Sequence, residues 1–316
     1  MKTKQTVFIA LSVWSIILIS SCTKLNNNTI ADPNAKQHNE DVSNTKSESD
    51  NLNTDINNVL KDVPGFGKKE NSAAITICGG TVDTSQQYAA TPTVTINFDG
   101  TTACGNPARK RSGQIKIELI QGAHWSDAGA KLRVTHTNYK VTFVNLNNHY
   151  LTFNGIKYLT NVNGFDWIGY YFSGSLTALI KERSDDMTVT FENGQTESWN
   201  TARLSTWAIT NYTTITATIN GDSISGNKII DSWGTTRFGT NFTTEMITPW
   251  KSGTTCGWWR PTQGRYTSTT ENFSVTATCS VNQQGNVVSG CGAYGYKIEW
   301  NYNNGAATGN AVIAYF

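Results

Sequence analysis

The sequence predicts an all-β body, built mostly from antiparallel hairpins and meanders, behind a polar N-terminal segment. Thr, Asn, Gly, aromatic and β-branched residues dominate residues 73–316, whereas the Ala, Leu, Glu and Lys typical of long helices are scarce there. Apolar and polar residues also alternate with a period of two in several runs, and Gly-containing turn pairs separate these runs. We therefore expect sandwich-like or extended twisted sheets.

The first 21 residues have the composition of a secretory signal peptide. Lys2 and Lys4 supply a positive start, and an almost unbroken apolar run covers residues 7–19. The run contains about a dozen residues, whereas a helix that crosses a bilayer needs roughly 20. We therefore expect an export signal that is cleaved, and not a transmembrane anchor.

The apolar run ends at a cysteine. The order Ile19-Ser20-Ser21-Cys22 resembles the lipobox of bacterial lipoproteins, in which the cysteine becomes the lipidated first residue of the mature protein. The resemblance implies that acyl chains such as palmitate attach the protein to a lipid bilayer through Cys22. Each buried methylene contributes about 0.8 kcal/mol, so two chains suffice for stable anchoring.

Residues 22–72 predict a flexible polar tether. Asn, Asp, Ser, Thr, Lys and Glu dominate this stretch, and such a composition cannot bury enough apolar surface to offset its ordering entropy. A coil of some fifty residues has an rms reach on the order of 40 Å. Apolar residues at helical spacing interrupt the tether and predict a short amphipathic helix between Asp50 and Pro64. These residues are Leu52, Ile56, Val59, Leu60 and Val63.

The body, residues 73–316, is long enough for one large domain or for two lobes divided near residue 183. Period-two alternation predicts strands over residues 115–119, 187–192, 215–219 and 294–302. Tight hairpin turns need positive φ angles, which Asn-Gly and Asp-Gly pairs supply. Such pairs occur at Asp99-Gly100, Asn154-Gly155, Asn193-Gly194, Asn220-Gly221 and Asn304-Gly305.

Five cysteines remain in the body once Cys22 is lipidated, and an exported compartment permits disulfides. Cys279 with Cys291, and Cys78 with Cys104, are the nearest neighbours in sequence, so we expect these two pairs to form disulfides. Spacing alone does not determine connectivity. On this pairing Cys256 is the odd cysteine.

The charges and motifs lead us to assign no catalytic residue, cofactor or metal. The chain has 25 Lys and Arg against 23 Asp and Glu, a net charge of +2, which argues against a nucleic-acid partner. The four histidines are scattered without metal-ligand spacing, and no Gly-x-Ser-x-Gly elbow occurs. His136 shares a predicted strand face with Leu132 and Val134, so we expect it to be a core residue.

A cluster of aromatic residues is the candidate ligand-binding site. Trp250, Trp258 and Trp259 lie in a Gly- and Pro-containing stretch that predicts a loop, and Tyr266 follows closely. Aromatic rings on loops of a β scaffold can bind sugar rings or protein partners. The same residues could instead fill the core.

Several segments of the body resemble a group of uncharacterised Bacteroidota lipoproteins. The segments are Thr95-Ile96-Asn97-Phe98, Cys104-Gly105-Asn106-Pro107, Arg109-Lys110-Arg111-Ser112-Gly113-Gln114-Ile115, Asn193-Gly194-Gln195-Thr196-Glu197-Ser198-Trp199 and Gly239-Thr240-Asn241-Phe242-Thr243. The resemblance implies an all-β exported body, anchored to the outer membrane on its periplasmic or cell-surface side. It implies no activity.

Three classes of function remain open. A surface module that binds a glycan or a protein fits the anchor, the β body and the aromatic loop. A structural envelope component would have no ligand. An exported hydrolase would need a nucleophile or a carboxylate pair that the sequence does not reveal.

Overall fold

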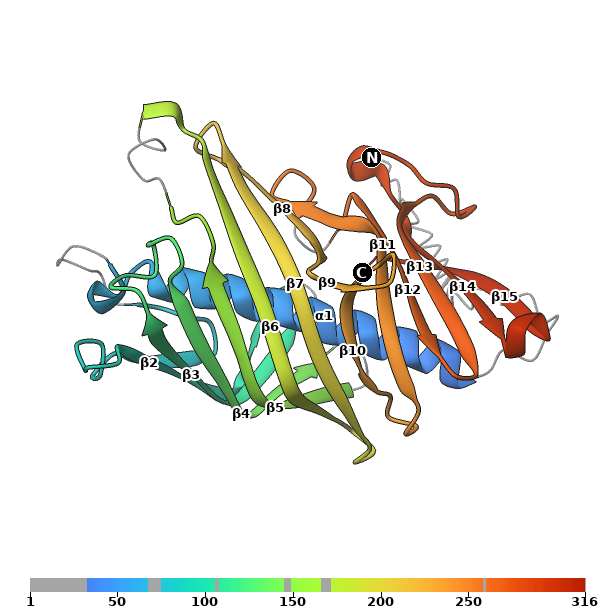
Figure 1. Cartoon of the computed structure of the whole chain (residues 1–316), viewed down its shortest axis with the longest axis horizontal. Helices are drawn as coiled ribbons and strands as arrows, with labels where there is room; N and C mark the ends of the chain where they lie inside the picture. The colour runs from blue at the N-terminus through green and yellow to red at the C-terminus, as the bar shows by residue number, and fades with distance from the viewer. Residues whose placement is uncertain are drawn as a thin grey trace, which may run out of the picture.

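The computed structural model describes residues 33–67, 75–105, 108–144, 149–165, 172–257 and 260–315. Within these ranges, one long helix lies along one face of a single 15-stranded antiparallel sheet (Figure 1). We call the face that packs on the helix the inner face and the opposite one the outer face. No helix in the described ranges is long and apolar enough to cross a membrane.

The long helix is α1 (Pro33–Leu60), and three short 3₁₀ helices are η1 (Pro64–Phe66), η2 (Gly290–Gly292) and η3 (Asn303–Gly305). The strands are β1 (Gly80–Asp83), β2 (Thr93–Cys104), β3 (Arg109–Gln121), β4 (Lys131–Phe143), β5 (His149–Asn161), β6 (Leu176–Phe191), β7 (Thr196–Thr210), β8 (Thr214–Gly221), β9 (Ser223–Ser225), β10 (Lys228–Thr235), β11 (Asn241–Gly253), β12 (Gln263–Thr270), β13 (Phe273–Val281), β14 (Gly295–Tyr302) and β15 (Ala307–Ala314).

The strands follow one another as a meander with a single complication. Strands β1 to β7 pair in sequence order, and so do β10 to β15. Strands β8 and β10 each pair with both β7 and β11, at different positions along those two strands. Strand β9 pairs with β10. The predicted all-β antiparallel body is therefore confirmed. Residue 183 lies inside β6 in the middle of this continuous sheet, so the sheet does not divide there.

Alternation along the strands builds the core on the inner face. In β3, Ile115 and Ile117 are fully buried beneath the helix layer, whereas Lys116 between them is exposed. The same alternation runs through β4, where His136 is 5% exposed between Val134 and Tyr139. The expectation that His136 is a core residue is confirmed.

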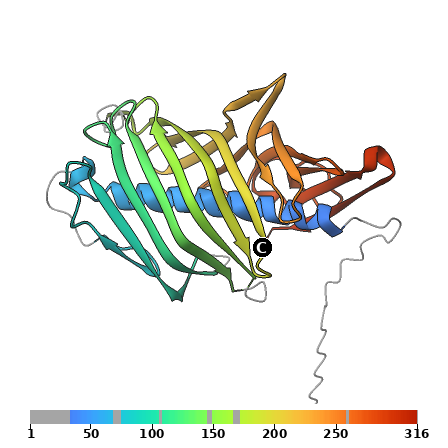
Figure 2. The same cartoon turned by 60° about the horizontal axis from the view of Figure 1, so that its bottom comes forward.

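A line of β-bulges bends the sheet. Register shifts occur side by side at Gly113, Asn138, Gly155 and Asp186, which belong to the adjacent strands β3 to β6 and all have positive φ. Bulges increase the local bend and twist of a strand. A Cβ at Gly113 would lie 2.0 Å from the carbonyl oxygen of Asn138, so glycine is required there. Figure 2 shows the sheet curving around α1.

The N-terminal segment differs from the predicted tether. Residues 33–60 form a helix along the length of the sheet, and the predicted short helix around residues 52–60 is only its last part. Polar composition did not prevent folding, because the sheet supplies partners for the polar side chains that the helix buries. Residues 1–32, including the signal peptide and Cys22, and residues 68–74 lie outside the described residues.

One predicted disulfide is confirmed and the other is wrong. Cys78 pairs with Cys104, but Cys291 pairs with Cys256, whose Cα is 5.0 Å away. Cys279 is free, because it faces inward on β13 and is 3% exposed, whereas Cys291 lies in η2, against the loop after β11. Cys279 and Cys291, although neighbours in sequence, therefore have different surroundings.

Candidate functional site

The predicted aromatic loop does not form a common binding surface in the described residues. Trp258 and Trp259 lie outside them. Trp250 is half-buried, and its Nε1 donates a hydrogen bond to Ser252 Oγ at 3.1 Å. Tyr266 is 1% exposed beneath α1, so it cannot stack on a ligand at the surface. The correction follows from strand geometry, because Tyr266 is an inward-facing residue of β12 and not part of a loop.

Charged side chains dominate the contact between α1 and the inner face. Successive turns of the helix reach different strands, so the helix connects both halves of the sheet. The ion pairs are Asp41 with Arg237 (2.6 Å), Lys46 with Asp231 (2.6 Å), Glu48 with Arg109 (2.8 Å), Asp50 with Arg203 (2.9 Å) and Asp55 with Arg111. Buried charges of this kind require partners, because an unpaired one is strongly destabilising.

The helix also docks through neutral hydrogen bonds. His38 Nε2 lies 2.7 Å from Ser268 Oγ, and Ser43 Oγ lies 2.9 Å from the Tyr266 hydroxyl. Burial and then the nearby Lys46 lower the pKa of His38 to about 3, which keeps the imidazole neutral. The C-terminal part of α1 adds apolar residues such as Leu52 and Ile56, both almost fully buried.

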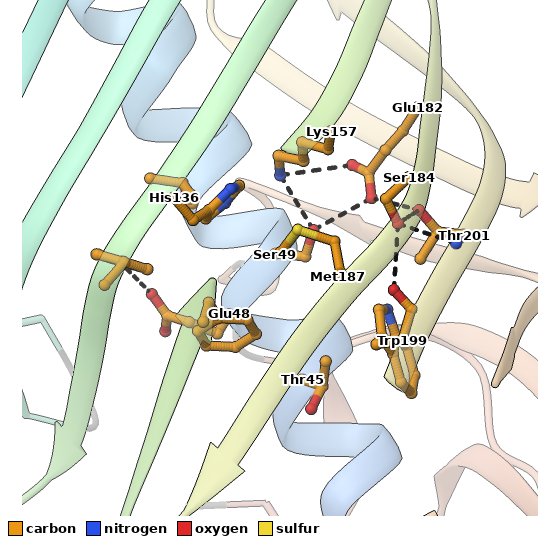
Figure 3. Close-up of a pocket in the computed structure, with 13 residues that line it drawn as sticks. Thr45, Glu48, Ser49, His136, Lys157, Glu182, Ser184, Met187, Trp199 and Thr201 are labelled. Carbon is orange, nitrogen blue, oxygen red and sulfur yellow. Dashed lines mark hydrogen bonds and ion pairs between the residues drawn. The ribbon is translucent and has the colours of Figure 1, made fainter. Parts of the chain in front are cut away.

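A small cavity lies beneath the middle of α1 (Figure 3). Its volume is about 20 Å³, and its lining includes Ser49, His136, Lys157 and Glu182. Lys157 Nζ donates to Ser49 Oγ at 3.2 Å, and burial lowers the pKa of Lys157. A serine beside a buried lysine is one arrangement of nucleophile and base.

That arrangement does not form an active site here. Lys157 also donates to Asn53 Oδ1 at 2.6 Å and lies 3.8 Å from Glu182. Burial alone would raise the pKa of Glu182, but Lys157 and Arg203 outweigh it and hold the pKa at about 2. A volume of about 20 Å³ holds a water molecule but no substrate. The cluster therefore fastens α1 to the sheet.

One buried carboxyl group stands apart from these pairs. Glu197 on β7 is fully buried, and neither of its carboxyl oxygens hydrogen-bonds to a described protein group. Burial raises its pKa well above the usual value, and the nearby Asp41 raises it further against the opposing effect of Arg237. The carboxyl group is therefore held in its neutral form beside the ion pair of Asp41 and Arg237.

A larger hollow lies on the outer face, and we call it the outer hollow. It has a volume of about 490 Å³ and lies over β7, β10 and β11, where the β9–β10 hairpin forms part of its wall. Trp233 is half-buried in it. Six of its eleven described lining residues carry a hydroxyl or amide side chain, and one of the eleven, Arg183, is charged. This size falls within the range of about 300–1,000 Å³ for small-molecule sites.

The outer hollow was not predicted from the sequence. No Asp, Glu, His or Cys is among its described lining residues. In the part of the chain that the structure describes, no three His, Cys, Asp or Glu residues come together as a metal site.

Comparisons with known proteins do not assign this chain to a family. No protein-family model matches it, and no curated protein or solved structure is significantly similar to it.

Proposed function

We propose that the protein is an exported, lipid-anchored binding protein of the bacterial outer membrane, which holds a glycan or protein ligand without transforming it. The observation that supports binding most directly is the outer hollow. It is large enough for a ligand, and no carboxylate, imidazole or thiol is among its described lining residues. General acid and base catalysis requires such groups within hydrogen-bond reach of the reacting atoms.

The start of α1 supports a short connection to the membrane. Pro33 begins the helix only eleven positions after Cys22, so ten residues separate the proposed lipid anchor from the folded body. A flexible coil of eleven residues has an rms reach of about 17–20 Å, and even the fully extended chain spans at most about 40 Å. The body would therefore stay close to the bilayer, with the β12–β13 end of α1 nearest the anchor.

Lipidation is tested by feeding labelled palmitate to cells that make the wild type or Cys22→Ala. We expect label and membrane retention in the wild type and neither in the variant. Label and retention that survive in Cys22→Ala would contradict the anchor.

Binding without turnover is tested with the full chain, purified in detergent, on an array of neutral and acidic oligosaccharides. We expect retention on a defined subset, with the oligosaccharides recovered unchanged. Release of shorter saccharides would instead indicate a hydrolase. Retention of no glycan on the array would contradict glycan binding and favour a structural envelope component.

A further inference from the structure

We propose that the outer hollow is a binding site for a neutral glycan, in which a sugar ring stacks on Trp233 while its hydroxyl groups bond to the serine, threonine and asparagine side chains beside it. The inference deepens the proposed binding function and rests on it. It assigns the ligand class and the residues that contact the ligand.

The floor of the hollow places an aromatic ring between polar side chains. In the sheet register, Trp233 on β10 lies directly opposite Asn200 on β7 and Thr243 on β11. The next outward-facing row places Thr235 between Ser198 and Asn241. Because directly paired residues project to the same face of a sheet, the indole and these polar groups share the outer surface. A flat ring flanked by hydroxyl and amide groups matches the alternating apolar and polar faces of a sugar.

The wall of the hollow supplies further hydroxyl groups. In the β9–β10 hairpin, Ser223 pairs with Ile230, and all three of Ser223, Ser225 and Ile230 line the hollow. Alternation then turns Ile224 and Ile229 away from the hollow, and these residues are 80% and 40% exposed. The hairpin therefore presents Ser223, Ser225 and Ile230 to the hollow and turns Ile224 and Ile229 to solvent.

Several of these polar groups are available to a ligand. Ser198 and Thr235 bond to each other, their hydroxyl oxygens lying 3.0 Å apart. In contrast, the side chains of Ser223, Ser225, Asn241 and Thr243 form no hydrogen bond to any described protein group. These groups are at least partly accessible to solvent, and a ligand that reproduces the hydrogen bonds of bound water can replace it.

The charge of the hollow favours a neutral ligand. Among the described residues that line it, Arg183 is the only charged one, and its guanidinium lies 3.4 Å from the carboxylate of Asp185. The carboxylate of Asp185 offsets the positive charge of Arg183, which an anionic ligand such as a phosphate or a carboxylate would need for binding. The guanidinium carbon lies over the Trp233 ring, 5.6 Å from its centre, which is within cation–π range. The Arg183 side chain is 56% exposed, so a sugar ring that stacks on this face of the indole displaces an exposed side chain and not a packed one.

A protein ligand fits the hollow less well. Binding hot spots of protein interfaces centre on well-packed, desolvated apolar pockets. The outer hollow instead offers one indole and Ile230 among many hydroxyl groups. Sugar rings need this combination of a single apolar platform and many hydrogen-bonding groups.

The test uses an array that carries neutral hexose and N-acetylhexosamine oligosaccharides and, as a second arm, sialylated and sulfated ones. The full-length wild type is compared with Trp233→Ala, with Thr243→Val, which removes one hydroxyl group at nearly constant volume, and with Trp250→Ala as a matched control. Circular dichroism and thermal melting establish that each variant is folded. We expect wild-type binding to neutral glycans that weakens at least about tenfold in Trp233→Ala, about 1.4 kcal/mol. Weaker but measurable loss is expected in Thr243→Val, and none in Trp250→Ala.

The outcomes separate this inference from the proposed function. If the wild type binds glycans and both folded hollow variants bind equally well, the ligand lies elsewhere and only the assignment of the hollow fails. Binding confined to the acidic arm would overturn the assignment of a neutral ligand. If the wild type binds no glycan at all, glycan binding itself fails. Should Trp233→Ala not fold, Thr243→Val alone decides, and unchanged affinity in it overturns the proposal.

Discussion

Replacing Lys46 tests most sharply whether α1 is an integral part of the fold. Lys46 Nζ lies 2.6 Å from Asp231 Oδ2 and 4.2 Å from the centre of the Tyr266 ring, and Asp231 is fully buried. Lys46→Met keeps an unbranched side chain of similar length but removes the cation that pairs with Asp231. Loss of one partner of a buried ion pair costs about 3–5 kcal/mol. We expect Lys46→Met to lower the free energy of unfolding at neutral pH by about that amount.

Two further variants give this expectation its controls. The double variant Lys46→Met/Asp231→Leu removes both charges, and replacing a buried pair by apolar residues is often neutral or stabilising, so it should recover most of the lost stability. Lys61→Met removes an exposed lysine just after α1 and should change stability by no more than about 0.5 kcal/mol.

The measurement is urea unfolding of all four proteins followed by tryptophan fluorescence. The docked helix predicts a large shift of the midpoint for Lys46→Met, recovery in the double variant and no shift for Lys61→Met. If Lys46→Met unfolds at the same urea concentration as Lys61→Met, then Lys46 is not buried in an ion pair. The helix would then behave as the flexible segment that its composition predicts.

Three further predictions concern buried groups and the bend of the sheet. Burial raises the pKa of Glu197 in the folded protein, so the wild type loses stability as the pH rises above the usual pKa of a glutamate, about 4.5. The stability of Glu197→Gln relative to the wild type should therefore grow by about 1.4 kcal/mol for each pH unit up to the raised pKa. Urea unfolding of both proteins between pH 5 and 8 measures this difference. Equal pH dependence in the two proteins would contradict a buried, unpaired carboxyl group. Gly113→Ala should lower the thermal midpoint far more than Gly194→Ala, since both glycines have positive φ but only a Cβ at Gly113 meets backbone atoms; equal losses would rule out the contact. Burial raises the pKa of Cys279 to about 12, so mass spectrometry after alkylation of the folded, non-reduced protein should find this thiol unmodified, and rapid modification would show that it is exposed.

The sequence predicted the β body well because its strands carry a repeating signal. Residues 115–119 alternate apolar and polar side chains, and the structure buries Ile115 and Ile117 as that pattern requires. In a sheet with one buried face, this period of two is enough to predict both the strands and the face that each side chain occupies. The cysteine pairing carried no such signal, because it depends on how loops distant in sequence fold over the sheet.

The helix was recognised only where its buried residues are apolar. Two series of inward-facing residues with seven-residue spacing run along the helix and just past its end, but polar residues interrupt the first series at Ser49 and begin the second at His38 and Thr45. The two series are Ala35, Val42, Ser49, Ile56 and Val63, and His38, Thr45, Leu52, Val59 and Phe66. A search for seven-residue spacing that admitted polar residues would have extended the helix to residue 35. The acidic series Asp41, Glu48 and Asp55 has the same spacing, and each member pairs with an arginine of the sheet.

The outer hollow had no signal of this kind. On β10 the residues that face inward include the polar Asp231 and Ser232, both fully buried, so alternation did not indicate which face Trp233 occupies. The residues of other strands that line the hollow come from β6, β7, β9 and β11, and Arg183 and Ser198 of β6 and β7 lie far before Trp233 in the sequence. The strand register brings these two beside it.

The most direct test of the proposed function is isothermal titration of the full chain with the neutral glycan that the array retains best, followed by chromatography of the glycan. We predict saturable binding at one site per chain and recovery of the glycan intact after prolonged incubation. Saturable binding followed by cleavage of the glycan would contradict a binding protein without catalysis.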